Sequence, residues 1–221
     1  MNKNTFTSRH IVVMAMFSAI AFISVLLSEF IPNVAGFLSY EPKDSIVVIA
    51  GLLFGPVHSL IISVVVSFIE MITISSTGPI GFLMNVIATC AFALPAAAVY
   101  KKNKTQKGAL IGLLIGILAM TASMLLWNYI ITPLYMHVDR AEVVGMLLPI
   151  FLPFNLLKGG LNAGLTLLLY KPVVTALRAT NLVEQSDSQN GKAKFSAGFF
   201  AFSLAVLVTF VLAFLAFAGV F

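Results

Sequence analysis

Charged residues are scarce in this sequence. Only 10% of its 221 residues are Asp, Glu, Lys or Arg, whereas an average soluble domain contains about 25%. Hydrophobic residues make up 60% of the chain, and the mean hydropathy is +1.04. This composition excludes a soluble globular enzyme, a disordered chain and a nucleic-acid-binding module. It indicates an integral membrane protein whose length allows about six or seven helical spans.

Cysteine and histidine are also rare. The single cysteine, Cys90, excludes a disulfide framework, and the three histidines argue against a metal site. The metalloprotease motif H-E-x-x-H, the nucleophile elbow G-x-S-x-G and the phosphate-binding loop are all missing from the sequence. The sequence therefore predicts neither an enzyme nor a pump that hydrolyses ATP unaided, and it calls for no cofactor.

Long apolar runs predict the transmembrane helices, because backbone polar groups in lipid must be satisfied within their own segment. Gly55-Pro56 divides one 30-residue run into a short helix and a longer one. The predicted fold class is an all-α polytopic membrane protein with three parts: six helices in residues 1–170, a cytoplasmic connector (171–194) and one more transmembrane helix (195–221). These six helices are expected at about 11–30, 45–54, 57–73, 80–100, 108–131 and 146–170. The short one, 45–54, is expected to be buried in protein rather than to form a full lipid-facing span.

The distribution of basic residues predicts the orientation. With a cytoplasmic N-terminus and alternating spans, ten of the 13 Lys and Arg residues fall on the cytoplasmic side. Lys43 and Arg140 fall outside, and Lys158 lies within a span. The acidic residues Glu41 and Asp44 also fall outside or near the outer ends of the spans. This asymmetry follows the positive-inside rule.

Lys158 is the clearest anomaly, because it interrupts an apolar helix. Asn155, Lys158 and Asn162 are spaced i, i+3, i+7 and share one helix face. Ionisable residues inside a span are costly unless paired, and they usually mark a functional interior. The alternative interpretation is a structural lysine that pairs with Glu70 or Asn128.

Further candidates could complete a ligand site. Asn128 lies between Trp127 and Tyr129, and Asn85 and Glu70 lie on neighbouring spans. Amides, a lysine and aromatic rings suit a planar, hydrogen-bonding heterocycle. Interhelical hydrogen bonds and an interfacial aromatic belt are the simpler explanations.

Several stretches together resemble one family, the substrate-binding S components of energy-coupling factor (ECF) vitamin transporters, nearest the riboflavin-transporter-like branch. The stretches span about three-quarters of the chain. They are 41–44 (EPKD), 51–56 (GLLFGP), 77–81 (TGPIG) with Asn85, 127–129 (WNY), 132–135 (TPLY) and 152–159 (LPFNLLKG).

The resemblance implies a bacterial cell-membrane protein with a six-helix core, a ligand pocket near the extracellular side and a long first loop that acts as a lid. The implied partners are a vitamin, a membrane coupling subunit and two cytoplasmic ATPases. Small residues placed as Ala15 and Ala19 dock on the coupling subunit in this family. Positions matching Asn128, Asn155 and Lys158 contact the ligand in its riboflavin-type members. The extra C-terminal helix departs from the usual core.

The ligand and the energy source have alternatives. Riboflavin is favoured over hydroxymethylpyrimidine, pyridoxine-like compounds and pantothenate. The preference is narrow, because the carboxylate of Glu70 would suit an amino-pyrimidine or a pyridine better. A self-sufficient permease driven by an ion gradient, with Glu70 and Lys158 as its titrating pair, is the alternative function. A membrane protein that binds no ligand is a third hypothesis.

Overall fold

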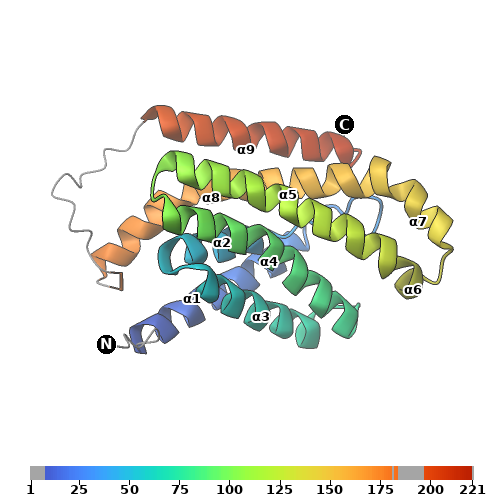
Figure 1. Ribbon diagram of the computed structural model, residues 1–221, viewed down its shortest axis with the longest axis horizontal. Coiled ribbons are helices and arrows are strands. Elements are labelled where there is room, and N and C mark those ends of the chain that lie inside the picture. Colours follow the sequence, from blue (N-terminus) through green and yellow to red (C-terminus); the bar gives the residue numbers. More distant parts are fainter. Residues whose placement is uncertain (1–7, 181, 184–196, 221) are drawn as a thin grey trace.

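The computed structural model describes residues 8–180, 182–183 and 197–220, and helices dominate this part of the chain (Figure 1). The helical elements are α1 (Ser8–Ser28), α2 (Lys43–Phe54), α3 (Pro56–Thr73), α4 (Gly78–Lys102), α5 (Gln106–Ile130), α6 (Thr132–Met136), α7 (Arg140–Met146), the π-helix η1 (Leu147–Phe151), α8 (Leu152–Ala179) and α9 (Ala197–Phe217).

The described helices confirm a polytopic membrane protein. Six helical stretches are long and apolar enough to cross a bilayer: α1, α3, α4, α5, the continuous stretch 140–179, and α9. The 12 residues of α2 are too few to span the roughly 30 Å hydrocarbon core. Nine of them are buried, so α2 is a short helix enclosed by protein, as the sequence predicts.

Gly55 forms the sharp junction between α2 and α3. Its φ of +98° lies in a region that side chains with a Cβ adopt only with strain. Pro56 follows at the first position of α3, where its missing N–H would in any case have no helical partner. The Gly-Pro pair therefore ends one helix and starts the next without an intervening loop.

The two ends of the bundle differ in charge. The start of α1, the connection between α4 and α5 and the end of α8 lie at one end of the molecule, and α6 and α7 lie at the other (Figure 1). Basic residues gather at the first of these ends, on the described residues Arg9, Lys101, Lys102, Lys104, Lys107 and Arg178.

The region predicted as a polar loop, 132–145, contains α6 and α7. From Arg140 the chain is helical through to Ala179, and η1 interrupts the α-helical pattern. Pro149 and Pro153 each remove an i→i−4 donor here, and the N–H of Leu152 donates instead to the carbonyl five residues back, on Leu147. The two prolines explain why one turn becomes π-helical while the helix itself continues.

The C-terminal part of α8 extends beyond the boundary at residue 170. The helix continues through Pro172 to Ala179, nine residues into the stretch expected to be a connector. Residues 184–196 lie outside the described residues, and the division into core, connector and additional helix stays a prediction. The final helix α9 lies alongside α8 (Figure 1).

Candidate binding site

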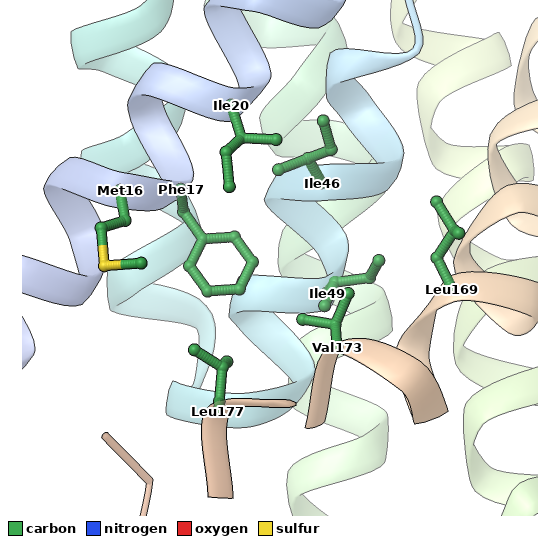
Figure 2. A pocket seen from close by; sticks show the side chains of 8 residues that line it. All are labelled: Met16, Phe17, Ile20, Ile46, Ile49, Leu169, Val173 and Leu177. Carbon is green, nitrogen blue, oxygen red and sulfur yellow. The ribbon is translucent and has the colours of Figure 1, made fainter. Parts of the chain in front are cut away.

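One cavity of the bundle is entirely apolar and fits a polar heterocycle poorly. It encloses about 170 Å³ between α1, α2 and the C-terminal half of α8 (Figure 2). Hydrogen-bonding groups of a ligand would lose their water partners there without replacement. The lining side chains are those of Met16, Phe17, Ile20, Ile46, Ile49, Leu169, Val173 and Leu177.

The strongest polar feature of the interior is an ion cluster of two lysines and three carboxylates. Lys158 Nζ lies 2.7 Å from Glu41 Oε2 and 3.8 Å from Asp44 Oδ2. Lys43 Nζ lies 2.5 Å from Glu70 Oε2 and 3.3 Å from Glu41 Oε1. Glu41 therefore bridges the two lysines, and the cluster joins α8, α3 and the N-terminal turn of α2 to the loop before it.

Side chains of α4 complete the cluster from a third direction. Asn85 Nδ2 donates to Glu70 Oε2 at 2.9 Å, and Thr89 Oγ1 donates to Asp44 Oδ1 at 2.6 Å. Asn85 and Thr89 are four residues apart, so they lie on one face of α4. A buried carboxylate is stable only when partners replace its hydration, and these donors contribute to that replacement.

Asn162 holds the backbone of the loop at the cluster. Its Nδ2 donates to the Glu41 carbonyl at 3.2 Å, and its Oδ1 accepts from Tyr40 Oη at 3.4 Å. Burial, followed by the charge of Asp44, raises the pKa of Tyr40, so its hydroxyl stays protonated and able to donate. Residues 40 and 41 are thus fixed to the same helix face as Lys158.

Glu41 remains ionised in this setting. Burial alone would favour its neutral form, but the charges of Lys158 and Lys43 outweigh burial and hold the pKa of Glu41 at about 2. The ordinary value is 4.5. The Glu41–Lys158 pair therefore persists throughout the neutral and mildly acidic range.

The other two amides bond to residues four positions away in the chain. Asn155 Nδ2 donates to the Phe151 carbonyl at 2.7 Å, at the end of η1. Asn128 Nδ2 donates to the Met124 carbonyl at 2.7 Å and its Oδ1 accepts from Thr132 at 2.8 Å. Both asparagines are buried, and α5 packs against η1 and α8.

The two aromatic neighbours of Asn128 differ in their surroundings. Trp127 is half-buried against the main hydrophobic core. Tyr129 is exposed, and the Arg140 guanidinium lies 5.3 Å from the centre of its ring. A cation over a ring is a favourable contact in itself. Tyr129 therefore lies with α7 rather than with the ion cluster.

The alternative interpretation of Lys158, a structural lysine paired with Glu70 or Asn128, named the wrong partners. Glu70 pairs with Lys43 and Asn85, and Asn128 bonds to residues four positions away in the chain, while Lys158 pairs with Glu41 and Asp44. The pair of Glu70 and Lys158 that an ion-coupled permease was expected to use is therefore replaced by two separate pairings.

Sequence reasoning missed three members of the cluster: Glu41, Lys43 and Asp44. It assigned these charges to the outer surface, because charged residues between apolar runs usually lie in water. Their signal was the charged stretch EPKD (41–44) at the start of a helix too short to span a membrane.

Substituting Glu41 by Gln should lower the thermal midpoint of unfolding, because it leaves Lys158 and Lys43 without a shared anion. The folded-state pKa is lowered, so this contribution of Glu41 is fully present above pH 4.5. It is lost as the pH falls from there through about 2. Thermal unfolding of both proteins in detergent between pH 7 and pH 3 should show the difference narrowing towards low pH. A difference independent of pH would contradict the assigned ion pair.

Comparisons with known proteins agree on one family. Residues 9–170 match the family model of the ECF transporter, substrate-specific component. The riboflavin transporter FmnP of Bacillus subtilis is 34% identical over 165 residues, which cover 68% of this chain and 84% of that protein. The riboflavin transporter RibU of Staphylococcus aureus is 29% identical over 177 residues, covering 77% of this chain and 93% of that protein.

A solved structure has the same architecture. It is an S component of a bacterial ECF transporter, which aligns with a TM-score of 0.64 and 29% identity over 76% of this chain and 97% of its own. The family match covers well over half of the sequence and includes every residue of the ion cluster, whereas α9 lies beyond it. The chain therefore belongs to the family of substrate-specific S components of ECF transporters.

Proposed function

We propose that this S component captures riboflavin from outside the cell and releases it inward. Members of the family bind a vitamin and associate with an ECF module of coupling and ATPase subunits. The proposed substrate follows from relatives in three bacteria, including Streptococcus thermophilus, each named a riboflavin transporter.

The buried lysine of α8 is the observation that carries this proposal. Lys158 is 7% exposed, and Asn162 lies on the same face of the helix. The flavin ring system is planar, with ring nitrogens and carbonyl oxygens along one edge. A lysine donates to such acceptors, and an amide both donates and accepts. We assign Lys158, Asn155, Asn162 and Asn128 to the substrate site, with Trp127, the sequence neighbour of Asn128, as the candidate ring for stacking.

The pairing of Glu70 favours riboflavin over the smaller alternatives. A carboxylate available to a ligand would select an amino-pyrimidine or a pyridine, but Glu70 is 3% exposed and is already bonded to Lys43 and Asn85. We therefore assign Glu70 and Asn85 to the support of the site. Tyr129, held by Arg140, belongs to the outer rim of the bundle.

Glu41 occupies the position that a ligand acceptor would take beside Lys158. It lies on the loop 29–42, between α1 and α2, and its side chain is 15% exposed. Since Lys158 cannot be left unpaired inside the bundle, ligand entry would exchange one acceptor of Lys158 for another. Because Glu41 belongs to the loop, this exchange would couple the position of the loop to ligand binding.

Riboflavin titrations of the purified protein test the proposal. We expect tight quenching of flavin fluorescence by the wild-type protein, and an affinity more than tenfold lower for Lys158→Met, because an ionic hydrogen bond contributes about 1.5–3 kcal/mol. No riboflavin binding by the wild-type protein would contradict the proposed substrate. Unchanged affinity in the variant would remove Lys158 from the site.

A double variant separates ligand contact from charge balance. Lys158→Met alone leaves Glu41 without one of its cations, whereas Lys158→Met with Glu41→Gln removes both charges. The proposal expects binding to stay weak in the double variant even where its thermal stability recovers. Recovery of affinity together with stability would mean that Lys158 acts only by neutralising Glu41.

The proposed docking surface for the coupling subunit is the outer face of α1. Ala15 and Ala19 are exposed there, four residues apart, and small residues at this spacing allow another helix to approach closely. Ala15→Trp should prevent co-purification with the coupling subunit while leaving riboflavin affinity unchanged. Ala205→Trp on the exposed face of α9 is the matched control. Normal complex formation by Ala15→Trp would place the docking surface elsewhere.

The proposed orientation puts the N-terminus in the cytoplasm of a bacterial cell, with the basic end of the bundle inside. A membrane-impermeant maleimide should then label Glu142→Cys in intact cells, and Lys104→Cys only in inverted vesicles. Both variants carry Cys90→Ser, which removes the native thiol. The opposite labelling pattern would reverse the orientation.

A further inference from the structure

The additional helix α9 is closely packed against α8. A Cβ at Gly160 would lie 2.1 Å from Cε1 of the Phe210 ring, and one at Gly164 would lie 3.1 Å from the Leu207 backbone. Larger side chains at either position would collide with α9. In a membrane, helices have no hydrophobic driving force between them and associate through such close contacts. The contacts at Gly160 and Gly164 therefore give α9 a defined packing position, its seat, on α8.

One side chain of α9 reaches from this seat to the loop 29–42. Phe214 is 3% exposed, although α9 as a whole is the least buried of the candidate spans. Its ring centre lies 5.7 Å from that of Tyr40 and 6.4 Å from that of Phe154. Val34, at the start of a tight turn in the same loop, belongs to the same small apolar cluster.

Tyr40 connects Phe214 to Lys158, the lysine of the proposed substrate site, through a short chain of contacts. Tyr40 precedes Glu41 in sequence, and both are bonded to Asn162. Glu41 in turn pairs with Lys158 at 2.7 Å. Packing of Phe214 against one face of Tyr40 therefore limits how far this end of the loop can move away from α8.

We propose that α9 is a built-in clamp on the substrate loop, and that Phe214 is its positioning residue. This inference rests on the proposed function, because it assigns Phe214 a role in how long the ligand stays bound. By holding Tyr40 against α8, Phe214 keeps the loop 29–42 closed over Lys158. The clamp is an addition of this chain to the family core, since α9 lies beyond the matched residues 9–170.

Stopped-flow fluorescence of riboflavin tests the clamp through the separate rates of binding and release. Phe214→Ala should raise the dissociation rate about three- to tenfold, which corresponds to the loss of an aromatic contact, and change the association rate much less. Phe214→Leu, which keeps an apolar side chain of similar reach, should restore most of the slow release. Phe202→Ala is the matched control, because Phe202 lies on the same helix and is 48% exposed.

Hydrogen exchange of the ligand-free protein provides a readout that does not depend on riboflavin. The proposal expects faster amide exchange in Phe214→Ala confined to residues 29–42, with the helices and the Phe202→Ala control unchanged.

If exchange and dissociation both stay at wild-type values, the clamp is wrong while the proposed function stands. If exchange rises throughout the bundle, Phe214 is a general stabilising residue and the clamp is equally wrong. If the wild-type protein does not bind riboflavin, the proposed substrate fails, and the exchange data still decide whether α9 restrains the loop.

Discussion

The ion pair between Glu41 and Lys158 is the contact on which the arrangement of this interior depends. The two residues are 117 positions apart in the chain, and their charged atoms lie 2.7 Å from each other. An unpaired charge inside an apolar bundle costs several kcal/mol. The loop 29–42 must therefore turn back into the bundle to bring Glu41 to α8. The helix that follows must begin inside the protein, because Lys43 and Asp44 in its first turn belong to the same cluster. A full-length span is incompatible with that starting point, because Gly55 ends α2 only 12 residues later.

The charges of the cluster also bear on the chemistry of the substrate. Two lysines face three carboxylates, and Glu70 and Asp44 each keep one oxygen outside the hydrogen bonds of the described structure. A ligand carrying a further carboxylate, such as pantothenate, would add negative charge to the proposed site, in which carboxylates already outnumber lysines. A neutral heterocycle needs no additional cation and can still use the donors of Lys158 and the amides. The electrostatics of the site therefore agree with the riboflavin named in the relatives.

Much of this architecture could be predicted from the sequence, because lipid imposes a simple rule on apolar runs. The spans and the break at Gly55-Pro56 follow from that rule and from backbone geometry, and Lys158 was conspicuous because it violates the rule.

The partners of Lys158 could not be predicted in the same way. Pairing depends on which helix faces meet, and Glu70 was one of several acids within reach. Glu41 was assigned to water because a loop between two spans usually lies there. The continuous helix from Arg140 to Ala179 was also missed, since prolines normally end helices, whereas a π-helical turn accommodates Pro149 here.

Two glycines of α8, Gly160 and Gly164, acquire a physical reason only when α9 is included. Gly160 is adjacent to glycine in the sequence and lies in the middle of a long helix, where glycine is destabilising by about 0.5–1 kcal/mol relative to alanine. Against lipid alone, a larger residue at this position would cost nothing and would favour the helix. With α9 in place, the same position accommodates the ring of Phe210. The sequence of α8 is thus fitted to α9, although α9 lies beyond the matched residues 9–170. The same packing of α9 on α8 places Phe214 against Tyr40, which precedes Glu41 in the loop 29–42. The fit between α8 and α9 therefore also affects the loop that carries Glu41.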